Sequence, residues 1–192
     1  MPHQTHKQYR FFNYDYGGIG DYFITVCTKD RIPHFGKIIQ TNKGALMELN
    51  EIGTFANESI CSIPDKYKDA TLGETIVMPN HIHLIITLPY KETVLQTEQS
   101  ITQKTLSPAK GLAPLITSSI SSIINHLKGN VTKWCRTNGY PNFTWQSRFH
   151  DHIIRDASSY NRISNYIANN VYNWQEDENN QNSNNFRKDI RS

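Results

Sequence analysis

The stretch from Val77 to Pro89, VMPNHIHLIITLP, places two histidines at the start of an apolar run. Pro79-Asn80 is a turn signal, and the β-branched residues after it predict a buried strand. Side chains of a strand alternate between its two faces, so His81 and His83 point the same way and Ile82 points the opposite way. Two neutral imidazoles side by side can hold one metal ion. Taken alone, the pattern equally fits two half-exposed histidines at a strand end.

Hydrophobic periodicity outward from this stretch predicts a mixed architecture. Helical spacing is found in three segments, and Asp156 is the expected N-cap of the last one. A largely antiparallel sheet covered on one face by the two long helices follows, which is an α+β fold. The predicted strands are Tyr22–Thr28, 70–79, 81–89 and 143–155; the predicted helices are Leu46–Ile60 closed by Pro64, Leu115–Trp134 stopping at Asn138-Gly139, and 156–174.

Length and composition are those of one globular domain. The chain has 192 residues, 37% of them hydrophobic, and a net charge of +3, which permits a polyanionic partner without requiring one. Three scattered cysteines without a CxxC pair, and a start without an apolar core, favour a cytoplasmic protein. We predict a basic N-terminal arm (1–16), one domain (17–175) with a mobile insertion (90–113), and a disordered polar tail (176–192).

A second histidine pair, His150 and His152, lies in another strand-like run. Four histidines on facing strands could form a zinc or cupin-type site. The cupin pattern requires an acidic ligand soon after its first pair, yet the first acid after His83 is Glu92. The chain thus departs from the cupin pattern. A metal hydrolase that uses both histidine pairs is kept as an alternative.

Three motifs then occur in a fixed order: VMPNHIHLII (77–86), WQSRFHDHIIR (145–155) and NRISNYIANNVYNW (161–174). The set resembles the HUH single-tyrosine transposases, and most closely the REP-associated tyrosine transposases, over about residues 20–175. Val171 stands where that family usually has proline, and His150 where it often has tyrosine. The resemblance implies a ferredoxin-like antiparallel sheet with helices packed on one face and a C-terminal catalytic helix.

The residues agree with this resemblance. Tyr166 and Asn170 are four positions apart on the last predicted helix and so share a face. A phenol can attack a phosphodiester, and an amide oxygen can join two imidazoles on a metal ion. Tyr160 and Tyr172 are each six positions away, on other faces of the helix. The resemblance implies catalysis by Tyr166, His81 and His83, with Mg²⁺ or Mn²⁺ held by His81, His83 and Asn170.

The implied substrate is single-stranded DNA with a hairpin, cleaved through a 5′-phosphotyrosine intermediate. A hairpin-binding protein without catalytic activity is the alternative from another functional class. Both a monomer and a homodimer that exchanges the tyrosine helix are compatible with the sequence. The candidate DNA contacts are Arg148, Arg155, Lys128, Lys133, Arg136 and Trp145. Trp145 could stack on an unpaired base, and packing in the protein core explains it equally well.

Overall fold

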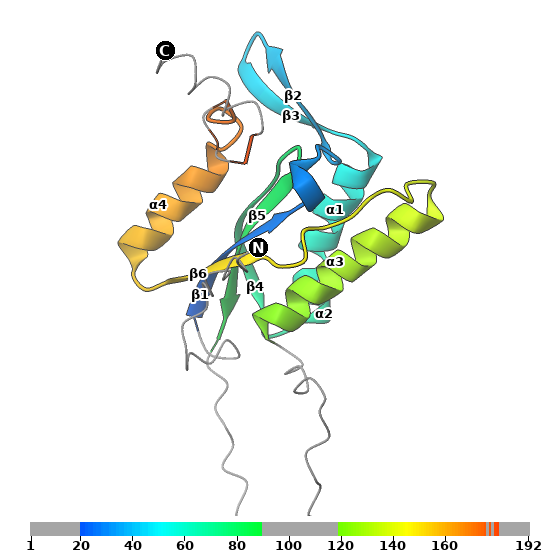
Figure 1. Cartoon of the computed structure of the whole chain (residues 1–192). Coiled ribbons are helices and arrows are strands. Elements are labelled where there is room, and N and C mark those ends of the chain that lie inside the picture. The colour runs from blue at the N-terminus through cyan, green and yellow to red at the C-terminus, as the bar shows by residue number, and fades with distance from the viewer. Residues whose placement is uncertain (1–19, 90–118, 176, 178, 181–192) are drawn as a thin grey trace, which may run out of the picture.

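The computed structural model describes residues 20–89, 119–175, 177, 179 and 180; the predicted arm and insertion lie outside them. A four-stranded antiparallel sheet has the order β4-β5-β1-β6 (Figure 1). Its strands are β1 (Gly20–Cys27), β4 (Thr71–Val77), β5 (His81–Leu88) and β6 (His150–Ile154). The helices are α1 (Glu51–Cys61), α2 (Ile63–Lys66), α3 (Ile120–Thr137) and α4 (Ala157–Ala168), with a short 3-10 turn η1 (Lys29–Arg31) and a hairpin of β2 (Gly36–Thr41) and β3 (Gly44–Leu49).

Without the hairpin and α2, the succession β1-α1-β4-β5-α3-β6 is the βαββαβ arrangement of ferredoxin-like folds. The predicted α+β architecture is confirmed. None of the helices in the described parts of the chain is long and apolar enough to cross a membrane.

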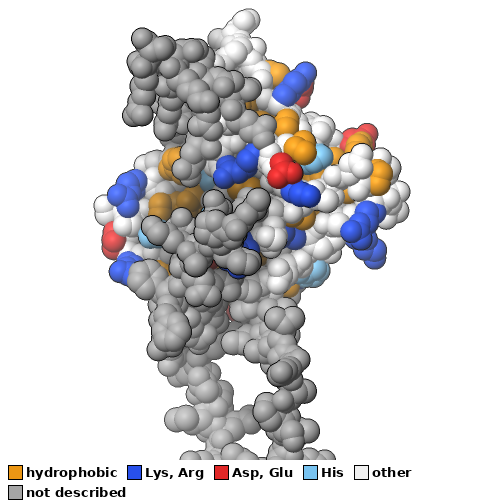
Figure 2. All heavy atoms as spheres, viewed as in Figure 1, with side chains coloured by type: hydrophobic (Ala, Val, Ile, Leu, Met, Phe, Trp, Pro, Cys, Tyr) orange, Lys and Arg blue, Asp and Glu red, His pale blue; other side chains and the backbone are white. Residues whose placement is uncertain are grey.

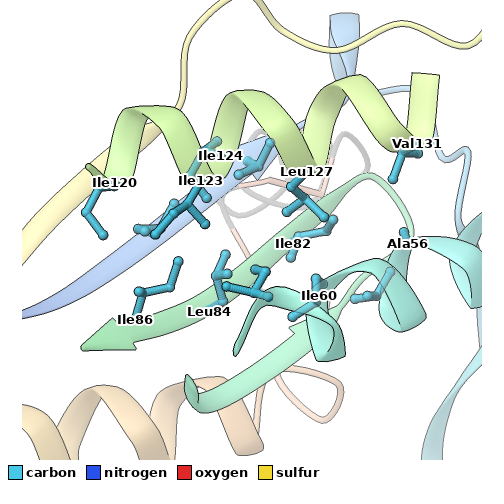
Figure 3. Packing of buried hydrophobic residues seen from close by; sticks show 14 of the residues in the cluster. Ala56, Ile60, Ile82, Leu84, Ile86, Ile120, Ile123, Ile124, Leu127 and Val131 are labelled. Atoms are coloured by element: carbon cyan, nitrogen blue, oxygen red, sulfur yellow. The ribbon is translucent and has the colours of Figure 1, made fainter. Parts of the chain in front are cut away.

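One face of the sheet carries the main core. Ile82, Leu84 and Ile86 of β5 point toward α3, whose apolar stripe packs down on them from above (Figure 3). Ala56 and Ile60 of α1 complete the layer. Each such isoleucine or leucine contributes about 1.5–3 kcal/mol by its burial, so β5 is held firmly in the middle of the sheet.

The opposite face of the sheet carries α4. Ile167 of α4 is buried against Ile85 of β5 and Ile154 of β6, with Tyr160 and Ile163 packed beside them. Asp156 caps this helix by accepting a hydrogen bond from the Ser159 N–H at 2.8 Å, as predicted. The sheet thus lies between a core layer of α1 and α3 and the single helix α4 (Figure 1).

Two predicted helix starts, those of α1 and α3, and one predicted helix end, that of α4, are wrong. Leu46 and Leu49 belong to β3, where Met47 and Leu49 pack against the core and Leu46 is 53% exposed. The side chains thus alternate between two faces as in a strand, and the spacing that resembled a helix does not describe them. The helix α1 begins only after Asn50, which caps it. The helix α3 begins at Ile120 rather than Leu115, because Ser119 has an extended backbone and caps it.

The last helix ends at Ala168, so Asn170 lies just beyond it. The end of α3 at Asn138-Gly139 is confirmed: Asn138 is the C-cap and Gly139 has a φ of 88°.

Gly73 forms a notch that receives Tyr160 of α4. A Cβ at Gly73 would lie 2.4 Å from the Tyr160 hydroxyl oxygen and 3.1 Å from Cβ of Ile85. We expect Gly73→Ala to lower the free energy of unfolding by about 1–3 kcal/mol, because the chain must shift to relieve the overlap. Urea denaturation followed by circular dichroism measures the change.

Two variants serve as controls for this prediction. Tyr160→Phe removes the clashing oxygen and should recover part of the loss when combined with Gly73→Ala. Gly129→Ala, on α3 with nothing within 4 Å of the new Cβ, should instead stabilise the protein by about 0.5–1 kcal/mol. An unchanged stability in Gly73→Ala would contradict the docking of α4 at this notch.

Candidate functional site

The two histidines of β5 are buried on the α4 face, with ring centroids 4.4 Å apart. His81 Nδ1 lies 2.9 Å from Oδ1 of Asn80, and His83 Nδ1 lies 2.9 Å from Oγ1 of Thr25 on β1. The Asn80 amide nitrogen already donates to the carbonyl oxygens of Arg31 and Asn179. Oδ1 of Asn80 is therefore an acceptor, so Nδ1 of His81 carries the proton and Nε2 presents a lone pair.

Two buried acceptor atoms in this site have no hydrogen-bond partner: Nε2 of His81 and Oδ1 of Asn170. Asn170 donates from Nδ2 to Asp177 at 3.0 Å, which leaves its oxygen unpaired. A hydrogen bond between Asn170 and the protonated His81 ring opposes the lowering of the His81 pKa. With Nε2 unprotonated both atoms are acceptors, so neither has a partner. Two lone pairs without a donor are costly in a protein interior, and a cation between them would remove that cost.

Asp177 provides a third type of ligand. One ligand atom each from His81, His83 and Asp177 lies within 4.8 Å of the others, and all three residues are buried. Imidazole nitrogens with a carboxylate or amide oxygen suit Mn²⁺, Zn²⁺ and, with more oxygens, Mg²⁺. The group can therefore hold a divalent metal ion.

Tyr166 reaches the same point from α4. Its hydroxyl oxygen lies 3.5 Å from Nε2 of His83 and 3.5 Å from Oδ2 of Asp177. Its ring packs edge-on against Phe23 of β1, and the side chain is 39% exposed. The hydroxyl thus lies beside the group that can hold a metal ion, while the residue is partly exposed. The structure brings Tyr166, His81, His83 and Asn170 together.

The segment after α4 was not expected to contribute. Asp177, Asn179 and Asn180 are buried, although they lie within the predicted polar tail (176–192). Trp174, also unpredicted as a site residue, stacks on His81 with ring centroids 5.9 Å apart. The asparagine-rich composition concealed this role, since Asp177 lies between two other acids, Glu176 and Glu178, and no pattern marks it as a ligand.

Burial lowers the pKa of both histidines. For His83 the pKa falls to about 4: loss of hydration is the main cause, Asp177 opposes it, and Arg31 lowers the pKa further. For His81 the pKa lies well below 6.5 because of burial, then because of repulsion from His83 and Arg31. Both rings are therefore neutral near pH 7, the state that can bind a metal ion.

The stability of the metal-free protein should depend on this neutrality. Because the pKa of His83 is about 6.5 in the unfolded chain and about 4 in the folded one, the unfolded state takes up the proton first. The stability that neutral His83 allows the folded protein is fully present above about pH 6.5 and is lost as the pH falls toward 4. We expect His83 to cost about 2 kcal/mol by pH 5, with His81 adding to the loss. Urea unfolding in EDTA at pH 7.5 and pH 5 measures this change.

His83→Gln, which cannot titrate, is the comparison for that measurement. It should lose clearly less stability than the natural protein between the two pH values. An identical loss in both proteins would mean that His83 does not stay neutral in the folded state.

The second histidine pair does not join the first. His150 and His152 are exposed on the edge strand β6, and β1 separates them from β5. The described residues that group around a possible metal ion are His81, His83 and Asp177, without either of them. Among the described residues, the group that can hold a metal ion thus uses one histidine pair, whereas the hydrolase alternative needs both.

The candidate DNA contacts are spread over the surface. Lys128, Lys133 and Arg136 line one shallow pocket of about 410 Å³ on α3, which packs on the face opposite α4, whereas Arg148 and Arg155 are exposed beside the two ends of β6. Figure 2 likewise shows Lys and Arg side chains at several separate places on the visible face.

Trp145 has a structural environment of its own. It packs against Phe35 and Phe143 and donates its indole N–H to the carbonyl oxygen of Lys128 at 3.1 Å. These contacts explain a tryptophan at this position without any role in base stacking.

Comparisons with known proteins agree with the fold. No family model matches the chain. An uncharacterised protein of Haemophilus influenzae is 33% identical over 177 residues, which cover 90% of this chain and 91% of that protein. A structure of a REP-associated tyrosine transposase bound to a REP hairpin is 22% identical and covers 97% of this chain and 86% of its own, with a TM-score of 0.53. The chain therefore belongs to one family with the Haemophilus influenzae protein, and its fold is that of the REP-associated tyrosine transposase, as its sequence motifs predicted.

Proposed function

We propose that the protein cuts and rejoins single-stranded DNA through a covalent bond to Tyr166, with a divalent metal ion held by His81, His83 and an oxygen of Asn170 or Asp177. The observation that carries the proposal is the pair of buried, unpartnered acceptors, Nε2 of His81 and Oδ1 of Asn170, beside the Tyr166 hydroxyl. Neither atom has a partner that would explain its burial, and a metal ion would supply one.

In the proposed reaction the Tyr166 oxygen attacks a phosphodiester phosphorus. The new bond joins that oxygen to phosphorus, the bond to the 3′ oxygen breaks, and a 5′-phosphotyrosine and a free 3′-OH result. Attack by a second 3′-OH reverses the step and joins new ends. The energy of the phosphodiester stays in the tyrosine link, so no nucleotide cofactor is required.

The surrounding residues have distinct parts in this reaction. Asp177 Oδ2, 3.5 Å from the hydroxyl, would accept the tyrosine proton. Asn80 and Thr25 fix the two imidazole rings through their Nδ1 atoms, which keeps Nε2 of each directed at the centre. The chemistry supplied by a bound divalent ion is Lewis-acid polarisation of a phosphate oxygen.

A folded-back DNA strand is the proposed substrate. The solved transposase of the same fold is bound to a REP hairpin, and the three sequence motifs of this chain resemble those of the REP-associated tyrosine transposases. Because α4 packs on the sheet of its own chain through Ile163 and Ile167, we further propose that one chain forms a complete site. The basic side chains on α3 and around β6 would contact the DNA backbone away from the cleaved bond.

Metal binding can be measured without DNA. We expect His81→Ala to weaken Mn²⁺ binding more than about tenfold, because it removes a buried ligand. His152→Ala, which removes an exposed histidine from the edge strand, should leave the affinity unchanged. Electron paramagnetic resonance of free Mn²⁺ during a titration gives both values. An equal loss in the two variants would contradict the proposed ligand set.

The nucleophile can be identified by a covalent adduct. The protein is incubated with a labelled pool of single-stranded hairpin oligonucleotides, with Mn²⁺ or with EDTA, and separated on a denaturing gel. We expect a metal-dependent labelled band that disappears in Tyr166→Phe, because phenylalanine lacks the attacking oxygen. Tyr172→Phe should keep the band, since Tyr172 is 62% exposed and lies outside α4.

A mobility-shift assay on the same pool completes this test. Tyr166→Phe should bind hairpins about as well as the natural protein. If the natural protein shifted hairpins yet gave no adduct under any metal condition, the binding-only alternative would be correct. An adduct of equal yield in Tyr166→Phe would assign the chemistry to another residue.

A further inference from the structure

Arg31 lies at the edge of the site and has no part in the mechanism above. It belongs to η1, the turn that follows β1, and its guanidinium Nη1 donates to Oδ1 of Asn179. The Asn179 N–H in turn donates to Asp177 Oδ1 at 2.6 Å, and the other oxygen of Asp177 contacts Tyr166. Arg31 is thus two hydrogen bonds away from the carboxylate beside the nucleophile.

The backbone that carries Arg31 is strained. Asp30 and Arg31 have φ values of 53° and 56°, a left-handed conformation that is uncommon for residues other than glycine. Surrounding hydrogen bonds hold the turn in this shape: Thr28 Oγ1 donates to the Ile32 carbonyl at 2.7 Å, and Asn80 Nδ2 donates to the Arg31 carbonyl at 2.9 Å. Such strain persists only where the environment enforces it, and it is concentrated at functional sites.

The positive charge of Arg31 acts on the site itself. It lowers the pKa of both His81 and His83, so its field reaches both metal-ligating rings. The partner it holds, Asn179 Oδ1, is a neutral amide oxygen, whereas an arginine fork binds phosphate oxygens more strongly and in a matching geometry. Phosphoryl transfer also gains from a cation near the oxygens on which charge develops.

We propose that Arg31 binds a DNA phosphate beside Tyr166, and that Asn179 Oδ1 occupies the place of a phosphate oxygen until DNA replaces it. The proposal rests on the proposed DNA-processing function. In this proposal the turn after β1 presents the Arg31 cation to the site. Asn179 Oδ1 competes with DNA for that cation and is displaced by a phosphate. Removal of Arg31 and removal of Asn179 should therefore have opposite effects on DNA binding.

The test measures the affinity for a labelled oligothymidylate, a single strand that needs no guide sequence, by fluorescence anisotropy in EDTA over a range of salt concentrations. We expect Arg31→Gln to weaken binding about tenfold and to reduce the salt slope by about 0.7, the value for one phosphate contact on a single strand. Arg31→Lys should lose less, because it keeps the charge. Asn179→Ala should bind several-fold more tightly than the natural protein, because it frees the guanidinium.

Two controls separate phosphate binding from structure. Arg31→Gly removes the side chain but suits the left-handed backbone, so it should melt at or above the natural temperature while losing affinity like Arg31→Gln. Lys37→Gln removes an exposed charge that is paired with Glu48 on the hairpin, and it should leave affinity unchanged.

Weaker binding in both Asn179→Ala and Arg31→Gln would overturn the proposal, because it would mean that Arg31 merely fastens the segment around Asn179. Unchanged affinity in Arg31→Gln, or no binding of the strand by the natural protein, would also overturn it. No cleavage is needed for this measurement, so an inactive Tyr166 would defeat the proposed reaction without affecting the result for Arg31.

Discussion

Alternation along β5 is the constraint on which both the core and the site depend. A strand in the middle of an antiparallel sheet presents successive side chains to opposite faces, so Ile82, Leu84 and Ile86 enter the main core while His81 and His83 face α4. A shift of register by one residue would put the imidazoles among aliphatic side chains and the isoleucines in the site. The apolar face therefore holds the histidines in place more firmly than any contact between the histidines could.

Burial of so many polar groups behind β5 requires a network that satisfies them. Asn80 is its centre: its oxygen accepts from His81, and its nitrogen donates to the carbonyl oxygens of Arg31 and Asn179. One side chain thereby fixes a metal-competent ring, the strained turn after β1 and the segment beyond α4. Two acceptors nevertheless stay unpaired in this otherwise satisfied environment, and a binding function explains them better than a purely structural one does.

The α4 face combines a fixed anchor with an accessible reacting group. Ile167 is buried against the sheet, and Tyr160 fits the notch at Gly73. Tyr166, which lies between these two residues in the sequence, keeps its hydroxyl near Nε2 of His83. A nucleophile must be held within a narrow range of positions, yet a DNA strand must reach it. Packing on one side of the helix and partial exposure on the other meet both requirements.

Local patterns in the sequence by themselves determined the histidine-bearing strand, the Asp156 cap and the motif order that indicated the fold, because periodicity and capping act over a few residues. The same reasoning misplaced Leu46 and Leu49, since short apolar runs fit both a strand and a helix. Only the tertiary structure decided the parts of the site taken from distant segments. Asn179 meets Arg31 from 148 positions away, and Asp177 reaches Tyr166 through a polar tail whose composition indicates disorder. No local pattern can specify such contacts, because they arise when the completed sheet and α4 bring remote backbone segments to one point.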